Sequence, residues 1–147
     1  MRIRPYEAGD LGPLVALWQA CGLTRPWNDP AADIAFCLGA PQAALLVGCD
    51  EPSGELIGSV MVGHDGHRGW VYYLAVAPER WKEGWGARLM ERAEAWLKER
   101  GVPKAQLMVR SSNTAAVGFY ERIGYRAESV ATLSKWLRPP PVEPDGS

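Results

Sequence analysis

The feature that most constrains the fold of this chain is a strand–turn–helix unit in its second half. Residues 70–76, WVYYLAV, are strongly β-prone, and Pro78 ends the run. A helical pattern then extends from about Gly86 to Arg100 and stops at Gly101. A strand that leads directly into a helix predicts an α/β domain, because the apolar face of such a helix must be buried against a sheet.

The other elements alternate in the same manner. Asp10 is placed to cap one helix, Asp29 to cap a second whose first position is Pro30, and Asn113 to cap a third. Residues 43–63 form two β-rich runs around a PSG turn, which predicts a hairpin. Strands are also expected at residues 1–6, 105–110 and 125–137. The expected order, β-α-α-β-β-β-α-β-α-β, predicts a mixed sheet with helices on its faces.

Length and composition limit the class of protein. The 147 residues fit a single domain, expected over residues 1–137, and the four prolines of residues 138–147 predict a disordered tail. A net charge of -1 gives no electrostatic case for nucleic acid. The sequence contains no apolar run of the ~20 residues that a membrane span needs and no signal-peptide core, so a cytoplasmic protein is expected. Three widely spaced cysteines without a CxxC pair suit a reducing compartment and predict no metal site.

The turn between the strand and the helix, RWKEGWG, contains glycines at positions 84 and 86. The first N–H groups of a helix have no intrahelical acceptor and carry partial positive charge. Glycines let the backbone of residues 82–87 approach an anion closely, so a pyrophosphate would fit here. The alternative is an ordinary strand-to-helix turn. The segment matches neither a Walker loop nor a dinucleotide fingerprint.

This segment resembles motif A of the GNAT acetyltransferases, V-x-P-x-x-[Q/R]-x-x-G-x-[G/A]. Val76, Pro78, Gly84 and Gly86 match the motif, whereas Trp81 stands at the Gln/Arg position. The family's second motif, N-x-x-A-x-x-[F/L]-Y-x-x-x-G-[F/Y], is matched by Asn113, Ala116, Phe119, Tyr120, Gly124 and Tyr125. The chain is also similar to the small bacterial YpeA-like branch at residues 25–30 and 63–69. The resemblance covers residues 1–137 and implies the GNAT fold, with a mixed, mostly antiparallel central sheet.

The resemblance implies an enzyme that moves the acetyl group of acetyl-CoA to an amine by direct attack in a ternary complex. Tyr120 would be the acid that protonates the departing thiolate. Backbone N–H groups near Leu74 or Val76 would stabilise the charge that develops on the thioester oxygen. The residues expected to bind CoA are Leu74, Ala75, Val76, Trp81, Lys82, Glu83, Gly84, Trp85, Gly86, Ala87, Asn113 and Phe119. Lys82 and Arg88 would supply the charge missing at Trp81, and Arg80 is expected to be a bystander.

The acceptor and the general base stay open. An alkyl ammonium must lose a proton before it attacks, so a base or a water chain is required. Asp65, His64, His67 and Glu79 are candidate bases, since Met108 stands where relatives that acetylate protein N-termini have a glutamate. The residues expected to recognise the amine are Trp27, Asn28, Asp29, Asp65, His67 and Tyr73. For Asn28, Asp29 and Asp65, helix capping and turn formation are equally good explanations.

Two further readings compete with the enzyme: a non-catalytic CoA-binding module of the same fold, and a structural or interaction protein. The acceptor is either a small molecule or a peptide amine. The exposed edges that the sheet is expected to have, above all at its last strands, make a homodimer a further possibility.

Overall fold

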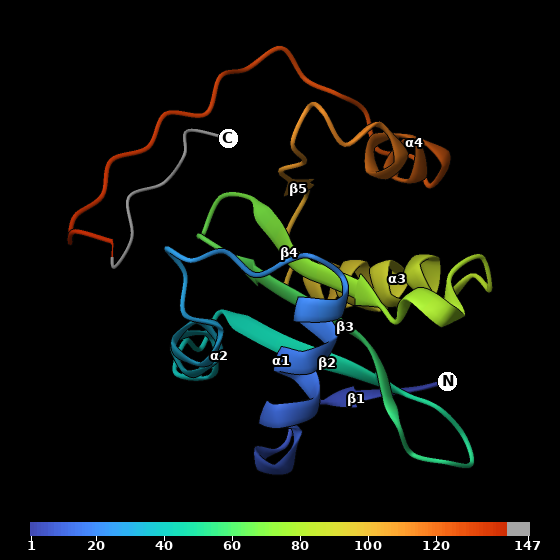
Figure 1. Ribbon diagram of the computed structural model, residues 1–147. Helices are drawn as coiled ribbons and strands as arrows, with labels where there is room; N and C mark the ends of the chain where they lie inside the picture. Colours follow the sequence, from blue (N-terminus) through green and yellow to red (C-terminus); the bar gives the residue numbers. More distant parts are fainter. Residues whose placement is uncertain (141–147) are drawn as a thin grey trace.

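The computed structural model describes residues 1–140 and contains one five-stranded sheet with helices on both faces (Figure 1). Residues 141–147, which make up most of the predicted tail, lie outside the described part. Two short 3₁₀ helices, η1 (Ala8–Asp10) and η2 (Pro78–Arg80), join longer elements. Those elements are β1 (Arg2–Pro5), α1 (Leu11–Ala20), α2 (Pro30–Leu38), β2 (Ala43–Cys49), β3 (Leu56–His64), β4 (Gly69–Val76), α3 (Trp85–Glu99), β5 (Ala105–Leu107) and α4 (Thr114–Arg122).

The strands lie in the order β1-β2-β3-β4-β5. The first three pairings are antiparallel, and β5 runs parallel to β4 over residues 69–71 and 105–107 alone. The sheet is therefore mixed and mostly antiparallel, as predicted. Beyond Val71, no strand of the described chain pairs with β4 on its β5 side, so the two strands separate there.

Two apolar cores hold the helices to the sheet. On one face, Leu14 and Trp18 of α1 and Ile34 of α2 pack against Val47 and Ile57. On the other face, residues of α3 pack against β2, β3 and β4, and the buried members of this core are Leu46, Val60, Val62, Val71, Leu89, Met90, Ala93 and Leu97. Successive strand residues point to opposite faces, so one hairpin supplies both cores.

The helix signals in the sequence are confirmed with one exception. Asp29 accepts hydrogen bonds from the N–H groups of Ala31 and Ala32, and Asn113 accepts one from Ala116. Asp10 was expected to cap α1, and this is wrong. Its carboxylate accepts instead from the N–H of Glu7, at 2.8 Å, and from the guanidinium of Arg4, at 2.7 and 3.0 Å.

The predicted strand at residues 125–137 does not form. Within the described chain no strand follows β5, and the segment runs on from α4 without regular structure (Figure 1). A strand exists only through hydrogen bonds to a neighbour, and no backbone–backbone hydrogen bond of the described chain involves residues 126–140.

Among the helices of residues 1–140, none has the length and apolar character that a bilayer span requires.

Candidate active site

The site is organised by a β-bulge in β4. Ser59 pairs with Ala75 and Met61 with Tyr72, so Tyr73 and the residue after it oppose one residue of β3. Tyr73 has a φ of 53°, in the left-handed region that favours glycine. Such a bulge bends the strand and redirects side chains, which here lie at the point where β4 separates from β5.

Four residues from different elements hold the bulge. The indole N–H of Trp18 donates to Ser59 Oγ at 2.9 Å, and that hydroxyl donates to the carbonyl of Tyr73 at 2.8 Å. The ring of Trp18 stacks on Tyr73, with centroids 3.7 Å apart. The Tyr73 hydroxyl donates to Asp33 Oδ2 at 2.6 Å. Burial, and then this contact with a carboxylate, raise the pKa of Tyr73, so the phenol keeps its proton at neutral pH.

A cavity of about 470 Å³ lies against this bulge. Its wall combines carboxylates with large apolar and aromatic side chains, and includes Asp33, Phe36, Met61, His64, Asp65, Trp70, Tyr72 and Tyr73. Asp65 and Tyr73 were predicted at the acceptor site and do line this cavity. Trp27, Asn28, Asp29 and His67 do not line it. Asp29 caps α2, and His67 is exposed in the β3–β4 turn.

The candidate bases differ in their surroundings. Hydrogen bonds from the N–H groups of Arg68 and His67 hold the pKa of Asp65 at about 2, so it stays ionised and cannot accept a proton near neutral pH. His64 Nδ1 already accepts from the N–H of Gly66 at 3.1 Å. Glu79 is exposed on η2 and is not part of the cavity wall. The described residues contain no group of three His, Cys, Asp or Glu that could hold a metal ion.

The turn before α3 presents a row of free backbone donors. No acceptor within residues 1–140 is hydrogen-bonded to the N–H groups of residues 82–87. Lys82 and Gly84 have φ values of 69° and 87°, and these left-handed conformations turn the chain into the N-terminus of α3. Six consecutive free N–H groups, of which the last three belong to the first turn of α3, make a site for a large anion.

Gly86 brings the two sequence motifs together. A Cβ placed on it would lie 3.2 Å from Phe119 Cζ, so the ring of Phe119 occupies the space that any other side chain would fill. Phe119 in turn makes an edge-to-face contact with Tyr120, with ring centroids 5.0 Å apart. The second motif therefore lies directly beside the turn formed by the first.

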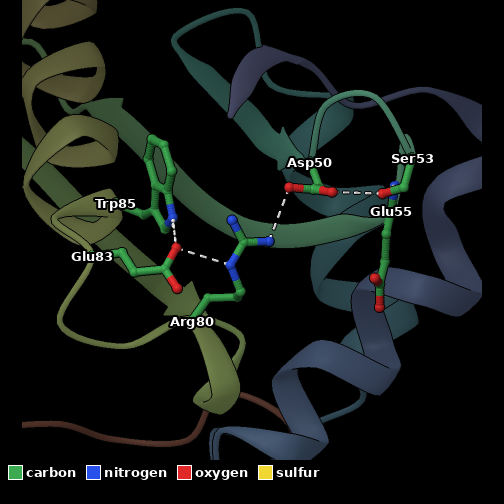
Figure 2. Close-up of polar contacts among 6 residues, drawn as sticks. All are labelled: Asp50, Ser53, Glu55, Arg80, Glu83 and Trp85. Atoms are coloured by element: carbon green, nitrogen blue, oxygen red, sulfur yellow. Dashed lines mark hydrogen bonds and ion pairs between the residues drawn. The ribbon is translucent and has the colours of Figure 1, made fainter.

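Arg80, expected to be a bystander in CoA binding, has a structural role in the turn that the sequence did not predict. Its guanidinium donates to Glu83 Oε1 at 2.9 Å and to Asp50 Oδ1 at 3.0 Å, as Figure 2 shows. Glu83 Oε1 also accepts from the indole N–H of Trp85 at 2.8 Å. Arg80 thus ties the turn before α3 to the β2–β3 turn and neutralises the one acidic side chain among the free N–H groups.

Trp81, at the Gln/Arg position of the motif, folds back onto the end of β4. Its indole N–H donates to the carbonyl of Val76 at 2.6 Å, and the Cys21 thiol reaches the same oxygen at 3.2 Å. The carbonyl of Val76 is therefore occupied. Ala77 donates its N–H to the carbonyl of Ile57 in β3. Successive residues of a strand direct their N–H groups to opposite edges, so the N–H of Val76 points toward the β5 side.

Tyr120 lies half-buried on α4 between the rings of Phe119 and Tyr125. Burial raises its pKa, which keeps the hydroxyl protonated at neutral pH. Within residues 1–140 this hydroxyl has no hydrogen-bond partner, whereas that of Tyr125 donates to Glu94 at 2.7 Å. Of the two tyrosines, Tyr120 is the one with a proton free to give.

The chain is similar to known proteins along most of its length. A model of the Acetyltransferase (GNAT) family matches residues 13–125. An acetyltransferase of Pectobacterium atrosepticum is 44% identical, and one of Yersinia enterocolitica is 42% identical; each match covers 93% of this chain and 96% of the relative.

Solved structures share the fold at lower identity. A transcriptional regulator from Bacillus halodurans superposes with a TM-score of 0.79 at 21% identity, over 92% of this chain and 99% of the other. AAC(6')-Iy, in complex with the bisubstrate analogue CoA-S-monomethyl-acetylneamine, superposes with a TM-score of 0.78 at 17% identity, over 92% and 97% of the two chains.

Proposed function

Because the chain belongs to the GNAT family of acetyltransferases, we propose that it transfers the acetyl group of acetyl-CoA to a cationic amine held in the cavity beside the β4 bulge. The observation that carries the proposal is the arrangement of three features along β4. The acidic, aromatic cavity lies at the bulge, the free N–H groups of residues 82–87 follow the end of β4 with Gly86 beside Val76, and the unpaired edge of β4 runs between the two.

The residues present fit CoA. The N–H groups of residues 82–87 would hold the pyrophosphate, and Gly86 with Phe119 leaves room for the backbone to approach it. The N–H of Val76 and that of Leu74, two residues earlier, would face the pantetheine and the thioester oxygen. Asn113 uses its Oδ1 as the cap of α4, which leaves its amide NH₂ for CoA. Acetyl-CoA supplies the activated acetyl group.

The cavity favours a cation. Asp65 is ionised at neutral pH, and one oxygen of Asp33 is engaged by Tyr73 while the other is left for a ligand. The rings of Tyr72 and Trp70 add faces that attract an ammonium group. We expect Asp33 and Asp65 to orient the amine before it loses its proton.

Asp65 is ionised with a low pKa, and His64 Nδ1 already accepts from the N–H of Gly66, so neither side chain takes that proton. The proton therefore leaves to water in the cavity, and the amine attacks once it is neutral. Tyr120 then supplies a proton from its hydroxyl to the departing thiolate. This predicts that kcat/KM rises with pH up to the pKa of the free amine itself.

The test is an acetyl-acceptor screen followed by two variants. Tyr120→Phe should lower kcat by about 10²-fold or more, the usual range for a lost general acid, with the affinity for CoA unchanged by calorimetry. Asp33→Asn should raise the KM for the amine more than it lowers kcat, since it removes the anion that orients the ammonium.

Other outcomes would favour the competing readings. Binding of CoA without turnover of any amine would indicate a non-catalytic CoA-binding module. A structural or interaction protein would show no rise in Tm with CoA, because a ligand that binds only the native state must stabilise it.

A further inference from the structure

The free N–H groups before α3 share their turn with an acidic side chain. Glu83 is the second of the six residues whose N–H groups are free, and its side chain is 42% exposed. A carboxylate inside an anion site opposes the anion that the site binds, because like charges repel strongly at short range. The charge of Glu83 must therefore be offset if residues 82–87 are to hold the pyrophosphate of CoA.

Arg80 provides this offset, and its guanidinium is held from a second side. Its Nε donates to Glu83 Oε1 at 2.9 Å, and its Nη1 donates to Asp50 Oδ1 at 3.0 Å (Figure 2). Asp50 is fixed in turn by the hydroxyl of Ser53, which donates to Oδ2 at 2.8 Å. Only 25% of the Arg80 side chain is exposed, so the β2–β3 turn keeps this arginine beside Glu83.

The contacts continue from Glu83 into the first turn of α3. Glu83 Oε1 also accepts from the indole N–H of Trp85 at 2.8 Å. Hydrogen bonds from Trp85 and Arg80 lower the pKa of Glu83, so it is ionised at neutral pH. The guanidinium carbon of Arg88 lies 5.1 Å from the centre of the Trp85 ring, within the range of a cation–π interaction. One chain of contacts, which we call the Arg80 network, thus joins Asp50, Arg80, Glu83, Trp85 and Arg88.

The network determines the charge beside the free N–H groups. Together with Lys82, it contains three cationic and two anionic side chains, which leaves a net charge of +1. Without Arg80 the net charge of the same group would be zero. The carboxylate of Glu83 would also lose the partner that holds it in place.

We propose that Arg80 is a positioning residue for CoA, which cancels the charge of Glu83 and so leaves the other cations of the turn unopposed. This role rests on the proposed function, because it takes the anion held by residues 82–87 to be CoA. Trp81, at the Gln/Arg position of the motif, has no charge, and its indole N–H is engaged by the carbonyl of Val76 at 2.6 Å. Arg80 compensates for Trp81 through a contact with its own chain rather than with the ligand.

A double-mutant cycle on Arg80 and Glu83 tests this role, with CoA affinity measured by calorimetry. Arg80→Met should weaken CoA binding by about 3- to 10-fold, the effect of one unit charge roughly 10 Å from a phosphate near a protein surface. Glu83→Gln should not weaken it, because glutamine keeps an oxygen for Arg80 and Trp85. The double variant should bind CoA within about twofold of the wild type, since it removes both charges together. A double variant as weak as Arg80→Met would overturn the proposal, because Arg80 would then act through the shape of the turn alone.

Salt and a matched variant separate local charge from other effects. The Debye length falls from about 10 Å at 0.1 M salt to about 3 Å at 1 M, so the difference in CoA affinity between the wild type and Arg80→Met should largely disappear at 1 M. Arg92→Met is the control, because Arg92 is exposed on α3 and makes no hydrogen bond or ion pair within residues 1–140. It removes the same charge and should change CoA affinity by less than about twofold. Equal effects of Arg80→Met and Arg92→Met, or a difference that salt does not reduce, would contradict the role of Arg80.

Turnover separates this role from the proposed function itself. Arg80→Met should raise the KM for acetyl-CoA and leave kcat and the KM for the amine unchanged, because no member of the Arg80 network lines the acceptor cavity. A wild type that binds CoA and acetylates an amine, with Arg80→Met equal to it in both, would refute the role of Arg80 alone. A wild type that does not bind CoA would refute both the role and the proposed function.

Discussion

Replacement of Ser59 by alanine tests whether the β4 bulge is held as described. Ser59 is 0% exposed, and its hydroxyl bridges the indole N–H of Trp18 and the carbonyl of Tyr73. Ser59→Ala would leave a buried indole N–H without an acceptor, which costs about 1–3 kcal/mol, and would remove a second hydrogen bond worth about 1 kcal/mol. We expect the free energy of unfolding to fall by about 2–4 kcal/mol, a large fraction of the ~5–15 kcal/mol of a typical domain.

The assay is urea unfolding followed by tryptophan fluorescence, with the slope m compared between variants. A loss of stability at constant m would indicate that the variant lowers stability without changing the surface exposed on unfolding. Tm should fall by roughly 2–4 °C per kcal/mol for a chain of this size. Ser111→Ala is the control, because Ser111 is exposed between β5 and α4 and its hydroxyl makes no hydrogen bond within residues 1–140, and it should change stability by at most about 0.5 kcal/mol. A loss below about 1 kcal/mol in Ser59→Ala would refute the bridging role.

Two further variants test the anion site and the N-terminal ion pair. Gly86→Val should weaken CoA binding by calorimetry and destabilise the fold by about 1–3 kcal/mol, because its side chain must displace Phe119. Gly12→Val, where a Cβ meets nothing within 4 Å, should leave CoA affinity unchanged, and equal effects of the two would contradict the packing argument. Hydrogen bonds from Arg4 lower the pKa of Asp10 in the folded state, so its contribution is present above an unfolded pKa of about 3.9 and is lost as pH falls through the folded pKa. The stability difference between the wild type and Asp10→Asn, measured by urea unfolding, should therefore be about 1.5–3 kcal/mol at pH 7 and shrink below pH ~4; a difference independent of pH would contradict the role of the ion pair.

The parts of the fold that sequence predicted are those set by local chemistry. Asp29 and Asn113 cap their helices through bonds to residues two or three positions away, and the β2–β3 hairpin is closed by a short turn. The strand–turn–helix unit is equally local. Each of these depends on residues that are close in sequence, so a pattern of residue types is enough to identify it.

The parts that sequence missed depend on contacts between distant residues. Trp18 meets Ser59 across 41 positions, and Tyr73 meets Asp33 across 40. Arg80 reaches Asp50 across 30 positions. No periodicity or cap rule marks such pairs. A weak signal exists where a tryptophan or a serine stands at a core position, because its polar atom must then find a hydrogen-bond partner. The strand expected at residues 125–137 does not form for a related reason. A strand needs a neighbouring strand to pair with, and β-propensity does not indicate whether one is present.

The left-handed backbone of Tyr73 places a limit on how this protein can be improved. A non-glycine residue in that region costs of order 1–3 kcal/mol, and glycine or asparagine would adopt the same conformation at less cost. Relief of this strain alone would therefore favour replacing Tyr73. Such a replacement would remove the ring that stacks on Trp18 and the hydroxyl that holds Asp33. These contacts offset the backbone strain, so the same residue that strains β4 also ties helices α1 and α2 to it.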